Sequence, residues 1–222
     1  MNKKILDLCG GTGSWSLPYR ENGYDVLNVT LPDYDVTKWR EYDEILQAVI
    51  ENDIYGILAA PPCTMFSHAR TTANEPRDTK SAMKIVKSCL EIIWESQYKV
   101  ETGRKITPLK FWALENPFYG ILKNFIGEPA FTFNPYNFGD AYKKKTALWG
   151  NFNKPEKIYD SPEEAMTEEQ IEKHKTNSQK LPKFDRMKTK DIHPEYYGKL
   201  SRKERRAITP SGFAYAFYEV NK

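Results

Sequence analysis

The sequence predicts an α/β fold built on a doubly wound, mostly parallel sheet. Short runs rich in branched and aromatic residues alternate with segments whose apolar residues recur at helical spacing. This alternation indicates βαβ units, in which parallel strands lie side by side with helices on both faces of the sheet. The predicted strands cover residues 5–9, 25–31, 54–60 and 111–115, and the predicted helices cover residues 40–51 and 81–95.

The size and composition of the chain exclude several classes of protein. With 222 residues, of which 40% are hydrophobic, the chain is long enough to bury a core without disulfides or a structural metal. The mean hydropathy is -0.69, and no apolar run approaches the ~18 residues that a membrane span requires. The N-terminal segment lacks the long apolar region of a signal peptide. We therefore expect a cytoplasmic protein.

The cysteines and histidines suggest no metal site. Cys9, Cys63 and Cys89 are an odd number without CxxC spacing, which fits a reducing compartment. The three histidines form no HxxxH or HxH pair, so we expect no bound metal. Cys89 falls on the apolar stripe of the helix predicted over 81–95, and we interpret it as a core residue.

The net charge of +3 is unevenly distributed along the chain. Residues 1–150 carry 18 Lys or Arg and 18 Asp or Glu, so the whole excess lies after residue 150. In residues 173–206, 12 bases oppose 4 acids, which leaves this stretch at +8. Two interpretations stay open: a solvated, lysine-rich surface, or a patch that binds phosphates. The residues that would contact phosphates are Lys183, Arg186, Lys188, Lys190, Arg202, Lys203, Arg205 and Arg206.

The same C-terminal third contains two helix-start patterns. SPEEAMTEEQIEKHK (161–175) opens like a capping box with proline at the first helical position, which predicts a helix. Residues 176–206 have few aliphatic side chains and are expected to be rich in loops. Thr209 and Pro210 predict the start of a C-terminal helix.

The first motif with chemical meaning, DLCGGTG, follows the first predicted strand. Glycines at this position let the backbone approach a ligand closely, and the following helix N-terminus favours negative charge. Position 16 is Ser, so the third glycine of GxGxxG is missing, and a glycine turn without a ligand is the alternative. The candidate ligand contacts in this motif are Asp7, Cys9, Gly10, Gly11, Thr12 and Gly13.

The second motif, APPCTMFS (residues 60–67), lies directly after the third predicted strand. Two prolines stiffen the backbone before Cys63, so the thiol is held in one direction at the edge of the sheet. A thiolate is a strong nucleophile, whereas the alternative for an isolated cysteine is a small buried apolar residue. Its position and rigid flanks favour Cys63 as a nucleophile.

The third motif, ALENP, places Glu115 directly after an apolar run. A glutamate is usually a surface residue, but partial desolvation here would raise its pKa and let it share a proton with a heterocyclic base. Because the carboxyl ends of parallel strands share one edge of a sheet, we expect all three motifs to lie together.

In this order the motifs resemble those of the DNA cytosine-5 methyltransferase family. DLCGGTG is similar to its cofactor motif, APPCTMFS to its Pro-Cys motif and ALENP to its Glu-Asn motif. Residues 140–146 (DAYKKKT) fall where the family carries a basic motif, and Asp35 is similar to the Asp that approaches the cofactor adenine. The resemblance covers about residues 4–150, with a looser match at 208–218. It implies the Rossmann-like fold of S-adenosylmethionine-dependent methyltransferases.

The resemblance also implies methyl transfer from S-adenosylmethionine to C5 of a cytosine flipped out of DNA. Cys63 would attack C6, Glu115 would bind the N3 and N4 edge, and Lys143 and Lys145 would hold the adjacent phosphate or ribose. The implied cofactor contacts are the residues of the first motif named above, Asp35 and Pro61. The implied nucleic-acid contacts are Ser67, Lys144 and the basic residues already named.

Three departures from the family pattern keep other functions open. Thr30 stands near the position of the acid that holds the cofactor ribose, so either Asp33 substitutes for that acid or the contact is missing. The C-terminal motif has Gly212-Phe213 where the family usually has Gly-Asn. Only about sixty residues separate the basic motif from the C-terminal motif, whereas typical members carry a large target-recognition domain there. The alternatives are the same chemistry on a free cytosine nucleotide or single-stranded nucleic acid, and a non-catalytic nucleic-acid-binding protein on a degenerate methyltransferase fold.

We therefore expect three parts in the chain. Residues 1–150 would form the catalytic and cofactor-binding core, residues 151–207 a small basic insertion for substrate or DNA contact, and residues 208–222 a helix that packs back on the core. We expect a bacterial or phage protein that acts as a monomer on cytosine-containing DNA, without a metal or membrane partner.

Overall fold

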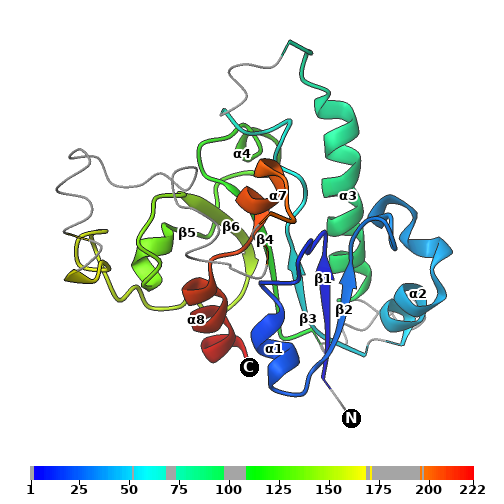
Figure 1. Cartoon of the computed structure of the whole chain (residues 1–222). Helices are drawn as coiled ribbons and strands as arrows, with labels where there is room; N and C mark the ends of the chain where they lie inside the picture. Colours follow the sequence, from blue (N-terminus) through cyan, green and yellow to red (C-terminus); the bar gives the residue numbers. More distant parts are fainter. Residues whose placement is uncertain are drawn as a thin grey trace.

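Six strands form one mixed sheet in the computed structural model, which describes residues 3–51, 53–68, 74–97, 109–168, 171, 196 and 198–222. The strand order is β2-β1-β3-β4-β6-β5, and helices flank the sheet (Figure 1). This confirms the predicted α/β class with a mostly parallel sheet. The strands are β1 (Lys4–Leu8), β2 (Asp25–Val29), β3 (Ile54–Ala59), β4 (Phe111–Pro117), β5 (Phe131–Phe133) and β6 (Thr146–Asn151).

The order of the strands creates a switch point in the sheet. Strands β2, β1, β3 and β4 pair in parallel, whereas β6 runs antiparallel between β4 and β5. From β1 the chain goes to β2 on one side and then returns to β3 on the other side. Ligands of open α/β sheets bind at the carboxyl ends of strands beside such a reversal. The loops after β1 and β3 flank this point.

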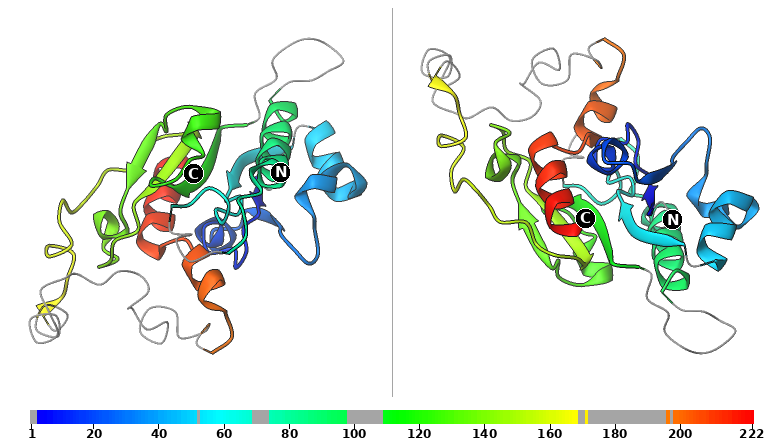
Figure 2. Two further views of the ribbon diagram at one scale, coloured as in Figure 1. Left: turned by 90° about the horizontal axis from the view of Figure 1, so that it is seen from above. Right: turned by 90° about the horizontal axis from the view of Figure 1, so that it is seen from below.

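Helices cover both faces of the sheet, as Figure 2 shows in views along the strands. On β1, Leu6 packs in the core that includes α3, while Ile5 packs in the aromatic core that includes α8. Helices α1 and α8 thus cover one face, and η1, α2 and α3 cover the other. The helices of the two layers are α1 (Leu17–Glu21), η1 (Val36–Glu41), α2 (Asp43–Ile50), α3 (Thr79–Glu95) and α8 (Ser211–Asn221).

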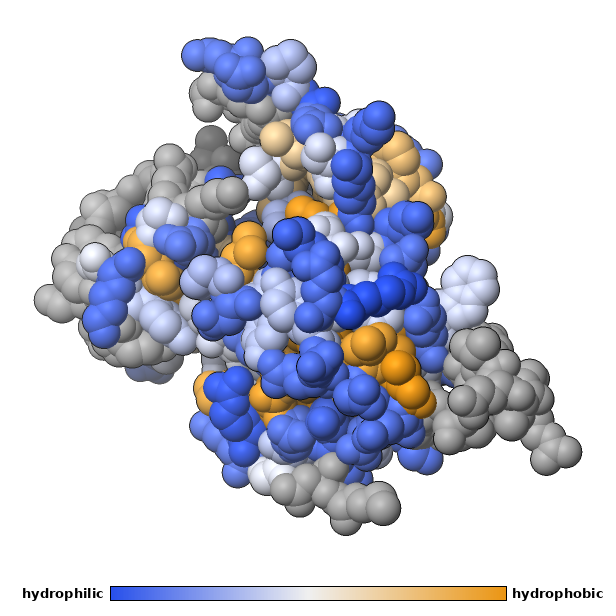
Figure 3. Space-filling view, turned by 90° about the vertical axis from the view of Figure 1, so that its right-hand side faces the viewer, coloured by the Kyte–Doolittle hydropathy of each residue, from blue (hydrophilic) through white to orange (hydrophobic). Residues whose placement is uncertain are grey.

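Local sequence signals explain the longest helix and the core role of Cys89. The Asp78 side chain caps α3 by accepting a hydrogen bond from the Ser81 N–H, at 2.9 Å. Val86, Cys89 and Ile93 then recur on the buried stripe of α3. Cys89 is fully buried, which confirms the interpretation as a core residue. The outer face of this layer, over α2, β2 and α3, is largely hydrophilic where it is described (Figure 3).

Three short elements complete the described helices, and one of them, η2, packs against α8. They are α4 (Lys123–Ile126), η2 (Pro135–Phe138) and α7 (Arg202–Ala207). Helix α7 starts with a capping box between Ser201 and Glu204. The helix predicted over 161–175 is wrong for residues 161–166, which form turns instead, although Ser161 and Glu164 make capping-type hydrogen bonds there.

Candidate active site

The three motifs lie next to one another at the carboxyl ends of β1, β3 and β4 (Figure 1). The Ala60 N–H donates a hydrogen bond to the Leu8 carbonyl at 2.9 Å, which joins the loops after β3 and β1. The Asn116 side chain, on β4, donates to the Pro61 carbonyl at 3.0 Å. The sheet edge therefore runs without a break from the glycine loop (residues 9–13) through the Pro-Cys loop (residues 60–67) to the end of β4.

Backbone contacts fix the turn that carries Cys63. The Cys63 carbonyl accepts hydrogen bonds from the N–H groups of Phe66 (3.0 Å) and Ser67 (2.8 Å). The Arg77 guanidinium donates to the carbonyls of Met65 (2.7 Å) and Ser67 (3.0 Å). The turn is closed on both sides, and Cys63 lies half-buried within it.

The Pro-Cys loop also pairs with the loop that follows β4. Ser67 forms a β-bridge with Gly120, and the Ile121 N–H donates to the Phe66 carbonyl at 3.0 Å. A β-carbon at position 120 would lie 3.1 Å from the Phe66 carbonyl oxygen, so this close pairing suits glycine. The Pro-Cys loop is thus held between Arg77 and the loop that follows β4.

Glu115, in the C-terminal half of β4, forms a charge pair with Lys144. Their side chains are only 16% and 17% exposed, and Lys144 Nζ lies 4.0 Å from Glu115 Oε1. Lys144 Nζ also donates to the Ile208 carbonyl at 3.4 Å, which ties the pair to the end of α7. Burial raises the pKa of the Glu115 carboxyl, and the Lys144 charge partly opposes this. The ionisation of Glu115 therefore depends on Lys144.

The charges around Cys63 come from the same group of residues. Burial and the negative Glu115 raise the pKa of the Cys63 thiol, whereas Lys144 and Arg206 lower it. A pKa above the usual value keeps the thiol protonated at neutral pH. Three charged side chains from three separate segments thus act on the Cys63 thiol: Glu115, Lys144 and Arg206.

The three lysines of the basic motif, Lys143, Lys144 and Lys145, lie in different environments. Lys144 Nζ lies 4.0 Å from Glu115 Oε1, whereas Lys145 Nζ lies 4.3 Å from the ring centroid of Phe118. Lys143 is exposed. The structure therefore places Lys144 beside Glu115 and Lys145 beside the Phe118 ring, and it leaves Lys143 at the surface. The catalytic role assigned to Lys143 and Lys145 stays a prediction.

Glycines shape the loop after β1. Gly11 and Gly13 have φ angles of +56° and +71°, which favour glycine. A β-carbon at Gly10 would lie 2.4 Å from Asp7 Cγ and 2.5 Å from Asn28 Oδ1. Gly10 is therefore required by the two polar side chains packed beneath it.

Asp7 lies fully buried under the glycine loop. The Ser16 hydroxyl donates to Asp7 Oδ2 at 2.6 Å, whereas Asp7 Oδ1 has no hydrogen-bond partner among the described residues. Burial raises the pKa of this carboxyl to about 6, and Ser16 and the Arg20 charge oppose the rise. This oxygen can accept a hydrogen bond from a bound group or from a water molecule.

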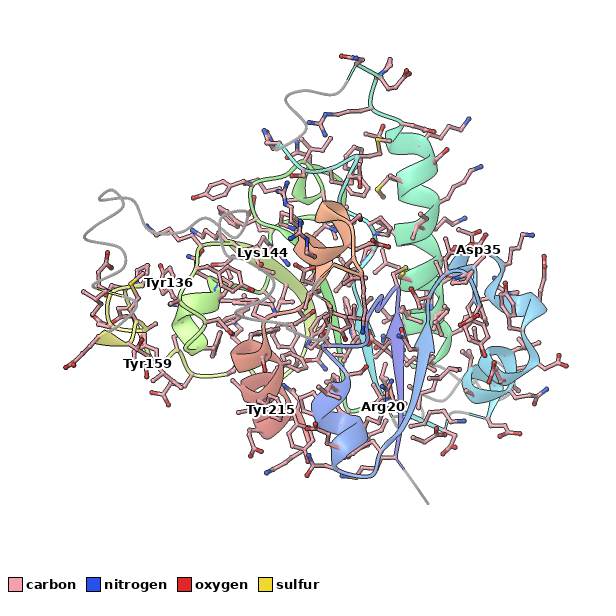
Figure 4. The ribbon with its side chains drawn as sticks, viewed as in Figure 1. Arg20, Asp35, Tyr136, Lys144, Tyr159 and Tyr215 are labelled. Carbon is pink, nitrogen blue, oxygen red and sulfur yellow. The ribbon has the colours of Figure 1, made fainter. Side chains whose placement is uncertain are left out.

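The remaining cofactor candidates have mixed surroundings. The Cys9 thiol interacts with Cys89 in the core and raises the pKa of that thiol. Thr12 shares a hydrogen bond of 2.6 Å with the Ser14 hydroxyl. Asp35 caps η1 by accepting hydrogen bonds from Thr37, which lower the pKa of its carboxyl. Asp35 lies beyond β2, away from Lys144 (Figure 4).

The position expected for a ribose-binding acid is occupied by a hydroxyl. Thr30 Oγ1 accepts a hydrogen bond from the Gly11 N–H at 3.3 Å, and Asp33 is exposed in the turn that follows. Asn28 also reaches the loop, where its Nδ2 donates to the Gly11 carbonyl at 3.0 Å. The side chains of β2 thus hold the glycine loop in place.

The basic stretch is only partly visible. Lys183, Arg186, Lys188 and Lys190 lie outside the described residues. Arg202 and Lys203 belong to α7, but only the side chains of Arg205 and Arg206 are described there. Of these, Arg206 acts electrostatically on Cys63. The C-terminal end of the stretch therefore reaches the candidate site.

Sequence reasoning missed several residues that shape the site. Ser16, Asn28 and Arg77 carry hydrogen bonds that hold Asp7 and the two loops. Lys144 was predicted as a nucleic-acid contact from the basic motif, but its place beside Glu115 was not predicted. Residues 143–145 precede β6, so no strand periodicity sets the direction of their side chains.

Comparisons with known proteins give no relative. No protein-family model matches the chain, and no curated protein is similar to it. Among the residues that the structure describes, no helix is long and apolar enough to cross a membrane. Across the same residues, no group of three or more His, Cys, Asp and Glu side chains is placed to hold a metal ion.

Proposed function

We propose that this protein transfers a methyl group from S-adenosylmethionine to C5 of cytosine in DNA, through a covalent adduct with Cys63. One observation carries the proposal: Cys63, Glu115 and Lys144 meet in a partly buried group beside a glycine loop. This combination offers a nucleophile, an acid that can carry a proton and a cation at one sheet edge.

The residues around the glycine loop fit such a cofactor. The unpaired Asp7 Oδ1 and the raised pKa of this carboxyl suit a ligand that brings positive charge, as a sulfonium and an amino group do. No side chain lies within 4 Å of a β-carbon placed on Gly11, so the loop has room above it. Asp7, the glycine loop and Pro61 would hold the cofactor, which when bound supplies an activated methyl group.

Cys63 and Glu115 divide the chemistry on the base. The Cys63 sulfur adds to C6 of cytosine and makes C5 nucleophilic, because C5 is too weak a nucleophile alone. Glu115 with a raised pKa donates a proton toward N3 and accepts a hydrogen bond from the N4 amino group. Lys144 and Arg206 favour the thiolate that this attack requires. Once C5 has gained the methyl group, water takes the C5 proton and the C6–sulfur bond breaks, which restores the ring and releases the Cys63 thiolate.

Basic side chains near the candidate site would make the contacts with nucleic acid. The exposed Lys143 and the half-exposed Lys145 surround the site, and α7 adds Arg205 and Arg206. Such side chains bind phosphates and position the strand without reading its sequence. The cytosine itself must leave the duplex stack, because C6 is otherwise out of reach.

A tritium-transfer assay tests the proposal. Labelled S-adenosylmethionine is incubated with duplex DNA, single-stranded DNA and cytosine nucleotides, and the 5-methylcytosine formed is measured. Transfer to DNA that is lost in Cys63→Ser supports the proposal. Transfer to nucleotides alone would assign the same chemistry to a smaller substrate. DNA binding without transfer to any substrate would favour the non-catalytic alternative.

A further inference from the structure

An aromatic and basic surface lies beside the candidate site, and of its members only Lys145 has a role in the chemistry described above. We call it the platform, and its members are Phe118, Tyr119, Lys123 and Lys145. The Tyr119 side chain is 65% exposed, which is unusual for a large aromatic residue in an ordered loop. Its ring packs edge-on against Phe118, with 5.2 Å between the ring centroids.

Two ammonium groups flank these rings. Lys145 Nζ lies 4.3 Å from the Phe118 centroid and 5.9 Å from the Tyr119 centroid, and Lys123 Nζ lies 5.4 Å from the Phe118 centroid. The only acid paired with them in the described residues is Glu128, 3.8 Å from Lys123 and mostly exposed. The platform therefore keeps a net positive charge next to an exposed ring.

Hydrogen bonds tie the platform to the segments that carry the reacting groups. The Tyr119 carbonyl accepts from the His68 N–H at 3.3 Å, directly after the Pro-Cys loop. The Phe118 N–H donates to the Lys145 carbonyl at 3.0 Å, one residue from Lys144. Phe118 itself follows the last residue of β4, the strand of Glu115. A nucleotide bound at Cys63 would therefore have its neighbours at the platform.

We propose that the platform binds an unpaired base next to the target cytosine, so that single-stranded DNA is the preferred substrate; this rests on the proposed function. An aromatic ring stacks on a base only when one face of that base is free, which a duplex does not offer. Lysines beside the ring attract the adjacent phosphates. The surface thus matches the pairing of rings and cations that recognises single strands.

Binding measurements test this inference without methyl transfer. A fluorescent single strand of about 12 nucleotides with one cytosine, a length within the usual site size, is compared with its duplex by anisotropy. In a second strand, 2-aminopurine beside the cytosine reports stacking. The wild type should bind the single strand more tightly and quench 2-aminopurine. Tyr119→Ala should weaken single-strand binding by about 5- to 150-fold, the range for loss of one stacked base, and abolish the quenching.

Two further variants serve as controls. Tyr119→Phe keeps the ring and should bind and quench like the wild type. Trp94→Ala removes a ring that is 68% exposed on α3, and it should change neither signal.

The inference is overturned if the wild type binds the duplex as tightly as the single strand, or binds neither. An equal loss for both DNA forms in Tyr119→Ala, or no loss, also overturns it. Binding that depends on Tyr119 without methyl transfer to any DNA would contradict the proposed function while leaving the platform in place.

Discussion

The sheet edge has a glycine half, formed by the glycine loop and Asp7, and a cysteine half, formed by the Pro-Cys loop, Glu115 and Lys144. Each half buries one acid, but different groups surround the two carboxyls. Asp7, under the glycine loop, has no exposed surface and receives a hydrogen bond from the Ser16 hydroxyl. Glu115, in the cysteine half, faces the Lys144 ammonium at 4.0 Å. Burial raises the pKa of both carboxyls. In the glycine half, the hydroxyl hydrogen bond is the main opposing effect, whereas the cysteine half sets an ammonium group and a thiol beside its acid.

The difference teaches how the two halves divide the work. In the glycine half, hydrogen bonds hold Asp7 and the glycine loop in place, and we call this arrangement the cradle. Asp7 Oδ1 has no hydrogen-bond partner among the described residues. The cysteine half sets the Cys63 thiol among three charged side chains, Glu115, Lys144 and Arg206. Changes in the first should therefore alter binding and stability, and changes in the second should alter rate and its pH dependence.

The largest expected effect is that of Cys63→Ser. Methyl transfer should fall about 10³-fold or more, because a hydroxyl is a much poorer nucleophile than a thiol. Stability should change by about 1 kcal/mol at most, since the shape is nearly kept. With 5-fluorocytosine in the DNA, the wild type should form a covalent adduct on denaturing gels, and the serine variant none. Cys9→Ser and Cys89→Ser should keep the adduct, so an adduct mapped to either cysteine contradicts the assignment.

Gly10→Ala tests the fixed cradle of the glycine half. The new methyl group would lie 2.4 Å from Asp7 Cγ, so Asp7 or Asn28 must move. Overpacking of this kind costs about 1–3 kcal/mol, and calorimetry should show lost binding of S-adenosylmethionine. Gly23→Ala is the matched control: its φ is +79° but no atom lies within 4 Å, so it strains the backbone without touching the cradle. Equal cofactor affinity in Gly10→Ala and the wild type would remove Gly10 from the site.

Asp7→Asn should stabilise the protein without ligand and should weaken the binding of S-adenosylmethionine. Because folding raises the pKa of Asp7 from 3.8 to about 6, the folded state holds the proton more tightly. The free energy of unfolding therefore decreases as the pH rises from about 4 to 6, by about 3 kcal/mol at most. The variant should lack this decrease and be more stable by about 1–3 kcal/mol at pH 7.5 in urea titrations. A wild type without this decrease would show that Asp7 ionises freely.

Lys144→Gln should change the pH dependence of the rate. Lys144 lowers the pKa of both Cys63 and Glu115, so its loss raises both values. The acid limb of the pH–rate profile, which reports thiolate formation, should therefore move to higher pH. Lys87→Gln, an exposed change on α3, is the control and should leave the profile in place. A profile that is identical in Lys144→Gln would separate this lysine from the reacting group.

The smallest effect concerns the basic stretch. Binding of duplex DNA should weaken with salt, with a log–log slope of about -0.9 for each phosphate that the protein neutralises. Arg206→Gln should make this slope less steep by about one such contact. A slope near zero in the wild type would return residues 173–206 to the interpretation as a solvated surface.

Local patterns predicted the parallel half of the sheet well. Each of β1 to β4 is a short run of branched or aromatic residues, and this signal lies within the strand itself. Their common edge follows from parallel pairing, so the adjacency of the three motifs could be predicted too. Strands β5 and β6 were not predicted, because β5 has three residues and both depend on antiparallel pairing with distant segments.

Prediction of the site from the sequence has the same limit. Glu115 could be found because it directly follows an apolar run, whereas the direction of the Lys144 side chain depends on where the chain turns after η2. The turn at 161–166 shows the reverse case. Its capping pattern is present and its hydrogen bonds form, but no helix follows at once, because a cap satisfies free N–H groups without supplying a buried face.

The contacts that close the cysteine half also set an order of assembly during synthesis. Asp140 accepts a hydrogen bond from the Gly212 N–H across 72 positions, and Lys144 reaches Ile208 across 64. Asp7 and Ser16, in contrast, are 9 positions apart. Closing long loops costs more chain entropy, and the ribosome releases the N-terminal segments first. The cradle can therefore form on the nascent chain, while Lys144 gains its partner in the C-terminal segment only after residues 208–212 emerge.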